Sequence, residues 1–155
     1  MGGRESALDP PPRNRGARRR SGLGGRDLAS RTVVMDKLFS VEGQVVLVSG
    51  GSRGIGRAIA QGFAERGAQV VITGRQSDTL KDAARAIAPA GHAVRPIVCD
   101  VSKPQEISAL VKAVLDEFRW IDTLVNVAGV NRRKPALDYR EEDFDFVLNI
   151  NLKAA

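Results

Sequence analysis

The sequence predicts an α/β domain in which a parallel sheet is covered by helices on both faces. Three observations lead to this fold class. Short apolar runs alternate with amphipathic stretches from Gln44 onward, a glycine-rich turn joins the first apolar run to a helical pattern, and Pro96 lies inside the third run. Alternation of this kind is typical of β-α-β units, whose parallel strands are joined by crossover helices.

Four strands are predicted from the apolar runs. Between consecutive runs the apolar residues recur at helical spacing, and a last helix is predicted from about Arg140. Pro96 cannot donate a hydrogen bond to a neighbouring strand, so the third strand should lie at an edge of the sheet. The doubly wound strand order 3-2-1-4 places it there. The predicted strands are Val45 to Ser49, Val70 to Thr73, Val94 to Cys99 and Ile121 to Asn126.

The first forty residues differ in composition from the rest of the chain. Residues 1–34 hold eight arginines and three acidic residues, which accounts for +5 of the formal charge of +6. They are rich in Gly, Pro and Ser and have too few spaced apolar residues to bury a face. We therefore expect a disordered basic extension over residues 1–40, with an organelle transit sequence as the alternative, and a folded domain over residues 41–155.

The remaining composition limits the partners and the compartment. The folded part is nearly neutral, so specific nucleic-acid binding is not expected, and no apolar run is long enough to cross a membrane. Cys99 is the single cysteine, which fits a reducing, cytoplasmic compartment, and we expect it to be packed in the core. A metal site is not predicted, because His92 is the only histidine and no cysteine cluster accompanies it.

The glycine-rich turn between the first strand and the first helix predicts a dinucleotide site. Gly50 permits a tight turn, Gly54 lets the backbone approach a pyrophosphate, and Gly56 lets the helix pack closely on the strand. The free N–H groups at the start of that helix favour phosphate. The fold is therefore expected to be Rossmann-like. Three further residues of the turn are candidate cofactor contacts: Ser52, Arg53 and Ile55.

The residues after the second strand indicate which dinucleotide is bound. A carboxylate that binds the adenosine ribose of NAD is expected about 20 residues after the glycine turn, but the chain has Gly74-Arg75 there. Arg75 and Arg53 can pair with a ribose 2′-phosphate, so the sequence favours NADP(H) over NAD(H). The alternative is that both arginines are solvated surface residues.

The ends of the third and fourth strands supply the other candidate contacts. Asp100, followed by Val101, is placed to accept a hydrogen bond from the adenine amino group. The alternative role for Asp100 is turn formation or helix capping, although Ser102 is the better candidate for the N-cap. Asn126, Ala128 and Gly129 would let the nicotinamide ribose approach the backbone, but small residues also suit any tight turn.

These motifs together resemble the short-chain dehydrogenase/reductase family. The resemblance covers Gln44 to Ala155 and rests on the glycine spacing, Asp100, Asn126-x-Ala128-Gly129 and Asn151. It implies an Asn-Ser-Tyr-Lys tetrad in which tyrosine moves the proton while nicotinamide transfers the hydride. Asn151 is the one tetrad member present and would support a proton-relaying water. The sole tyrosine, Tyr139, has no lysine four residues later, so we expect it in packing or at the surface.

The resemblance implies an NADP(H)-dependent oxidoreductase acting on a small carbonyl or alcohol, whose full-length form is a dimer or tetramer. The present chain would be a fragment with an incomplete sheet, and it would be inactive because it lacks the catalytic Tyr and Lys. The alternative is a catalytically inert nucleotide-binding or regulatory fragment. Because an incomplete sheet would leave the fourth strand unpaired, we expect low stability. The cations of Arg132-Arg133-Lys134 suggest an acidic substrate such as a sugar acid related to gluconate, with a 3-oxoacyl thioester as the alternative.

Overall fold

The computed structural model describes residues 37–88 and 94–155. The basic extension predicted for residues 1–40 lies outside the described residues up to residue 36. The described chain starts with the short 3-10 turn η2 (Lys37–Phe39). All that follows concerns the described residues.

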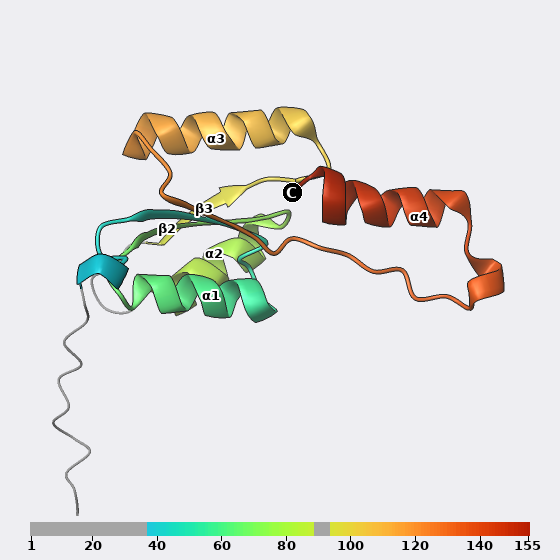
Figure 1. Ribbon diagram of the computed structural model, residues 1–155, viewed down its shortest axis with the longest axis horizontal. Helices are drawn as coiled ribbons and strands as arrows, with labels where there is room; N and C mark the ends of the chain where they lie inside the picture. Colours follow the sequence, from blue (N-terminus) through green and yellow to red (C-terminus); the bar gives the residue numbers. More distant parts are fainter. Residues whose placement is uncertain (1–36, 89–93) are drawn as a thin grey trace, which may run out of the picture. The chain divides into compact units, whose positions relative to one another are not determined.

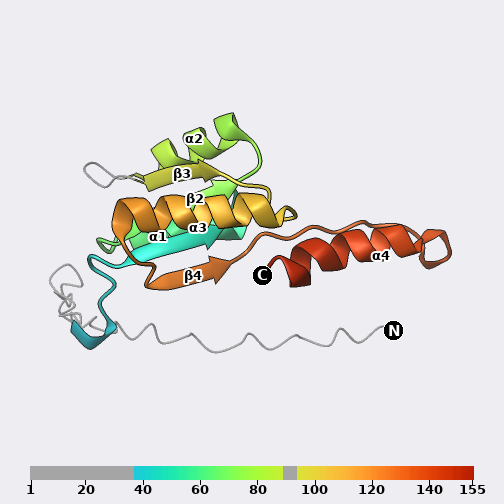
Figure 2. The same cartoon turned by 90° about the horizontal axis from the view of Figure 1, so that it is seen from above.

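The sheet has four parallel strands: β1 (Val45–Ser49), β2 (Gln69–Gly74), β3 (Val94–Val98) and β4 (Thr123–Asn126). Their order is β3-β2-β1-β4, which confirms the predicted topology (Figure 2). Every residue of β1 is buried, as expected for a central strand with helices on both faces. Pro96 pairs with Ile72 on the edge strand β3, where its missing N–H faces no other strand.

Helices cover both faces of the sheet (Figure 1). The helices α1 (Gly54–Ala64) and α2 (Ser77–Ile87) pack on one face, around a core that includes Val46 and Ile72. On the other face, α3 (Pro104–Phe118) packs against a second core that includes Leu47 and Cys99. The side of α1 that faces the sheet is made of Gly56, Ala60 and Ala64. Such small residues let the helix axis approach the strands closely.

The start of α3 differs from the prediction. Ser102 does not cap the helix: Lys103 is the N-cap residue, and no side chain accepts a hydrogen bond from the first turn. Instead, the backbone N–H and the hydroxyl of Ser102 both donate to Oδ1 of Asp100, at 3.0 and 2.8 Å. Pro104 occupies the first turn, where its missing N–H costs no hydrogen bond.

One carboxylate joins the amino ends of β1 and β4. Oδ2 of Asp122 accepts a hydrogen bond of 2.7 Å from the backbone N–H of Val45, and the N–H of Asp122 donates to the Val45 carbonyl at 2.9 Å. Val45 is 1% exposed. The edge strand β4 is therefore fixed to the central strand before the ladder between them begins at Val46 and Thr123.

The last helix extends beyond the carboxyl ends of the strands in both views (Figures 1 and 2). It consists of α4 (Glu141–Leu148) followed directly by the π-helical turn η4 (Asn149–Lys153). Its largest apolar side chains are not packed in a core, since Phe144 is 58% exposed. The one buried residue of α4 is the charged Asp143.

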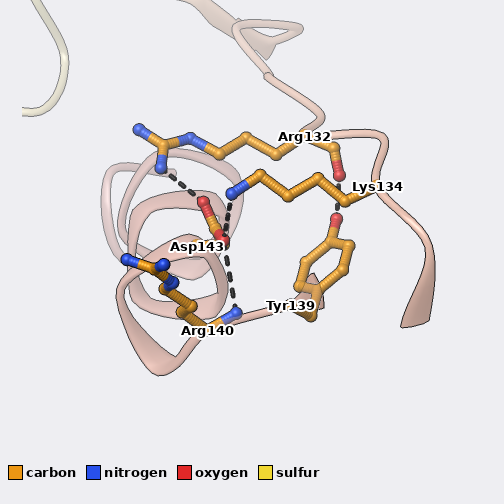
Figure 3. Close-up of polar contacts among 5 residues, drawn as sticks. All are labelled: Arg132, Lys134, Tyr139, Arg140 and Asp143. Carbon is orange, nitrogen blue, oxygen red and sulfur yellow. Dashed lines mark hydrogen bonds and ion pairs between the residues drawn. The ribbon is translucent and has the colours of Figure 1, made fainter. Parts of the chain in front are cut away.

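Asp143 is the centre of a polar clamp, which we define as Arg132, Lys134, Tyr139, Arg140 and Asp143 (Figure 3). The two carboxylate oxygens of Asp143 accept from the Arg132 guanidinium and the Lys134 ammonium, each at 2.6 Å, and from the Arg140 backbone N–H at 3.3 Å. The Tyr139 hydroxyl donates to the Arg132 carbonyl. The clamp thus ties the segment after β4 to the first turn of α4.

The clamp keeps Asp143 ionised. Hydrogen bonds from Lys134 and then Arg132 hold the pKa of the carboxyl well below its usual range. The Arg132 guanidinium also lies 4.2 Å from the centre of the Phe146 ring, which is a cation–π arrangement. A group whose pKa is lowered by folding stabilises the folded state above its unfolded pKa and loses that contribution as the pH falls.

Replacing Asp122 by Ala should destabilise the sheet. The change removes the acceptor of the Val45 N–H and leaves a donor of a buried strand without its partner, at a cost of about 1–2 kcal/mol. Urea unfolding followed by circular dichroism measures the loss. Asp116→Ala is the control, because it removes an exposed i,i+4 pair with Lys112 worth only a few tenths of a kcal/mol. Equal effects of the two changes would contradict the role of Asp122.

Replacing Asp143 by Asn should loosen α4 at neutral pH and make the protection of its amides less sensitive to acid. In the parent chain we expect protection of the α4 amides to be full above about pH 4, the ordinary range of an Asp carboxyl, and to fall as the pH drops below it. The Asn variant should show faster amide hydrogen exchange at pH 7 and little further change in acid. The idea fails if parent and variant respond to pH in the same way.

Candidate functional site

A cavity of about 300 Å³ lies at the carboxyl ends of the strands, where ligands of doubly wound sheets bind. Of the predicted cofactor residues, only Gly54 and Asn126 are not among those that line it. Asn126 is exposed on β4. The predicted residues that line the cavity are Gly50, Ser52, Arg53, Ile55, Gly56, Arg75, Asp100, Val101, Ala128 and Gly129.

Two of the three glycines predicted to shape the turn, Gly50 and Gly56, have no room for a side chain, and neither has Gly51, where a Cβ would lie 2.7 Å from the Cβ of Ile72. A Cβ on Gly50 would lie 2.7 Å from the backbone nitrogen of Ala128, and Gly50 has a φ of +84°. A Cβ on Gly56 would overlap the carbonyl oxygen of Gly50. Gly56 therefore lets the first turn of α1 lie against the glycine turn itself, rather than against the strand as predicted.

Gly54 differs from the other two glycines. Its φ is +54°, a left-handed conformation that favours glycine, but a Cβ there would meet nothing within 4 Å. A side chain at Gly54 would therefore extend into open space, although Gly54 is not among the residues that line the cavity. No side chain caps the first turn of α1, and that turn holds no acidic residue. The helix start therefore has the unpaired N–H groups and the positive potential that bind phosphate.

Two arginines stand beside this turn. Arg53 and Arg75 line a second hollow together with Ser52, Gln76 and Thr79, at the start of α2. Both arginines are exposed, and neither makes an ion pair within the part of the chain that the structure describes. Their charge is therefore available to an anion.

Asp100 performs the turn-forming role that the sequence left as an alternative. Its pKa is lowered, first by the hydrogen bonds from the Ser102 hydroxyl and backbone N–H, and then by the nearby charges of Arg75 and Lys103. The carboxylate is therefore ionised at neutral pH. The Ser102 bonds use only Oδ1. Its other oxygen, Oδ2, accepts no hydrogen bond from the described residues, and Asp100 is one of the residues that line the cavity.

Sequence reasoning missed several residues of the cavity wall. Cys99 was assigned to the core and is 1% exposed, yet it also lines the cavity. Burial raises the pKa of the Cys99 thiol, and Glu106 and Asp100 add to the effect. The other lining residues that were not predicted as contacts are Thr73, Gly74, Val127, Val130 and Ile150. Their positions in the sequence could have indicated Thr73 and Cys99. Each lies at the end of a predicted strand, one or two residues before a predicted contact, Arg75 or Asp100.

Asn151 lies in the π-helical turn η4 and is exposed. Its Oδ1 accepts from the Val130 N–H at 2.8 Å, and its Nδ2 donates to the Val130 carbonyl at 2.9 Å. The amide thus holds the backbone just after Gly129, at the wall of the cavity. Support of a proton-relaying water by Asn151 stays a prediction.

The segment after β4 has fewer available cations than the sequence suggested. Arg132 and Lys134 are both paired with Asp143, each at 2.6 Å. Arg133 alone of the three makes no ion pair with a described residue. The Tyr139 hydroxyl donates to the Arg132 carbonyl, and the side chain is 40% exposed, which fits the structural role expected for it.

Residues 37–88 and 94–155 hold neither a cluster of metal ligands nor a membrane-spanning helix. This part of the chain contains no group of three or more His, Cys, Asp or Glu side chains that could hold a metal ion. None of its helices is both long and apolar enough to span a membrane.

Known proteins of similar sequence are reductases and dehydrogenases. The chain is 40% identical over 114 residues to the 3-oxoacyl-[acyl-carrier-protein] reductase FabG of Vibrio cholerae, which covers 74% of this chain and 46% of that protein. It is 36% identical over 117 residues to gluconate 5-dehydrogenase of Gluconobacter oxydans, covering 76% and 46%. The chain thus spans about half the length of the curated relatives it matches.

A solved structure agrees with the sequence relatives. A metagenomic short-chain oxidoreductase in complex with NADP superposes with a TM-score of 0.69 at 39% identity, covering 74% of this chain and 52% of that one. The family model described as "short chain dehydrogenase" matches residues 44–155, which include the glycine turn, all four strands and Asn151. The chain therefore belongs to the short chain dehydrogenase family.

Proposed function

We propose that this chain provides the NADP(H)-binding part of an oxidoreductase that transfers hydride between nicotinamide and a small carbonyl or alcohol. The observation that carries the proposal is the cavity at the strand ends, with the glycine turn on one side and two unpaired arginines beside it. Family members use nicotinamide cofactors, and one structural neighbour is a complex with NADP.

The cavity fits such a cofactor because its backbone is open where phosphate has to approach. The start of α1, whose Ile55 and Gly56 line the cavity, offers N–H groups to a pyrophosphate. When bound, the cofactor supplies the hydride. We propose that the chain contacts it through Gly50, Ser52, Arg53, Gly54, Ile55, Gly56, Arg75, Asp100, Val101, Asn126, Ala128 and Gly129.

The choice of NADP(H) over NAD(H) follows from the charges beside the turn. Arg53 and Arg75 flank the second hollow, where no carboxylate is present among the lining residues. Two guanidinium groups without internal partners favour the dianionic 2′-phosphate, and a carboxylate at either place would favour a free ribose hydroxyl.

Substrate and assembly are proposed more broadly. Relatives named for 3-oxoacyl thioester and for gluconate chemistry are almost equally similar, so we propose either class. Pairing of Arg132 and Lys134 with Asp143 removes most of the charge that favoured an acidic substrate. We also propose a cytoplasmic location, based on the single free cysteine, and a dimer or tetramer, based on exposed apolar residues such as Leu124, Phe144 and Leu152.

A second candidate is a catalytically inert nucleotide-binding or regulatory protein. It is favoured by one observation: Tyr139 donates its hydroxyl to the Arg132 carbonyl, and no lysine lies four residues after it. Tyr139 is therefore unsuited to proton transfer. Reduction of 3-oxoacyl thioesters or oxidation of gluconate by the chain with NADP(H) would exclude this candidate, and nucleotide binding without turnover would support it.

Replacing Arg75 by Asp should reverse the cofactor preference. Calorimetry should show that the parent chain prefers NADPH to NADH. The variant should lose about ten- to hundredfold in NADPH affinity, because one charge-assisted hydrogen bond is lost and like charges are opposed. Arg85→Asp is the control, since Arg85 lies in the last turn of α2 and pairs with Asp82. A parent chain that binds NADH more tightly than NADPH would refute the arginine assignment.

Replacing Gly56 by Ala should abolish nucleotide binding. The new Cβ would overlap the carbonyl oxygen of Gly50 and lie 2.9 Å from its carbonyl carbon, so the glycine turn has to shift. Gly62→Ala in the same helix is a matched control, because its Cβ would meet only the Arg66 guanidinium at 3.6 Å. That change should leave binding intact and raise stability by about 0.5–1 kcal/mol. Calorimetry measures the binding and urea unfolding measures the stability. Equal binding by the two variants would contradict the role of Gly56.

A further inference from the structure

The hydroxyl of Thr73 is a buried polar group without a partner. Thr73 is 0% exposed, and its Oγ1 makes no hydrogen bond within the described structure. It is the only such side-chain atom found among the described residues. Because a buried hydroxyl is expected to have a hydrogen-bond partner, an unpaired one calls for an explanation, such as a bound group.

The position of Thr73 points to the cavity. Thr73 lines it, near the end of β2, and its backbone carbonyl already accepts from the Gly51 N–H at 3.0 Å. Side chains alternate along a strand, so Thr73 shares the α3 face with Val71, which packs in the same cluster as Cys99. Its register neighbour in β1 is Ser49, but the two hydroxyls are not hydrogen-bonded to each other.

We propose that Thr73 is a further cofactor-binding residue, whose hydroxyl forms a hydrogen bond with the adenosine half of the bound nucleotide. The inference rests on the function proposed above. Arg75 follows β2 and Asp100 follows β3, which is the strand next to it in the sheet. An adenosine that extends from Asp100 to Arg75 has to cross the end of β2, where Thr73 lies.

Bound adenosine supplies the hydrogen-bond partner that the Thr73 hydroxyl lacks in the chain. Without nucleotide the hydroxyl is desolvated and unpaired, so removing it should cost the folded chain nothing. With nucleotide the hydroxyl gains a partner, so removing it should weaken binding. A residue with a purely structural role would show the opposite pattern.

The test compares Thr73→Val, which removes the hydroxyl at similar volume, with the parent chain. The ligand is adenosine 2′,5′-bisphosphate, which has no nicotinamide half, and calorimetry gives its Kd. We expect Thr73→Val to weaken binding about five- to tenfold, the usual net effect of one hydrogen bond, while the urea midpoint without ligand stays equal or rises. Thr73→Ser should bind like the parent.

The control is Thr123→Val, the same change at the far end of β4, where the hydroxyl contacts Gln44 outside the cavity. It should leave the Kd unchanged. If Thr73→Val does not fold, Thr73→Ser and Thr73→Ala provide a second pair that differs by the hydroxyl alone.

The outcomes separate this inference from the proposed function. Tight binding by the parent with an unchanged Kd for Thr73→Val would overturn the role of Thr73 and leave the function standing. A lower urea midpoint for Thr73→Val without ligand would also overturn it, because the hydroxyl would then have a partner inside the chain. If the parent binds neither the bisphosphate nor NADPH, the proposed function itself fails.

Discussion

The close approach of backbone at the glycine turn is the constraint on which the rest of the structure depends. Gly50 lies against Ala128, two residues after the end of β4, and Gly56 lies against the carbonyl of Gly50. Together these contacts bring the first strand, the first helix and the fourth strand to one point. Any side chain at either glycine would separate them, so the cavity exists only because this part of the turn lacks Cβ atoms.

The two ends of the sheet are held by different forces. At the amino end, Asp122 satisfies the backbone of Val45 and aligns β4 with β1. At the carboxyl end, the polar clamp around Asp143 and the amide of Asn151 hold α4 and η4 against the segment after β4. Apolar packing contributes less there, since Phe144 and Leu152 are exposed. The wall of the cavity next to Val130 and Ile150 is therefore set by charge and hydrogen bonding.

The arginines show how one chain uses the same residue type in two ways. Arg132 is neutralised by a buried carboxylate and serves to position α4, whereas Arg53 and Arg75 have no such partner and remain available to an anion. From the sequence alone, the cations after β4 are candidates for attracting an acidic substrate. Only the contact with Asp143, which is 9–11 residues away along the chain, assigns two of them to structure.

The sequence by itself determined the strand order, the edge position of Pro96 and most of the cavity wall, because these depend on local periodicity, on the missing N–H of proline and on strand ends that meet at one edge. Most of the predicted contacts line the cavity, although their roles stay predictions. Only the tertiary structure decided which polar side chains have hydrogen-bond or ion-pair partners. The pairing of Asp143, the two bonds from Asn151 to Val130 and the unpaired hydroxyl of Thr73 each depend on distances between separate elements, and residue spacing along the chain does not encode such distances.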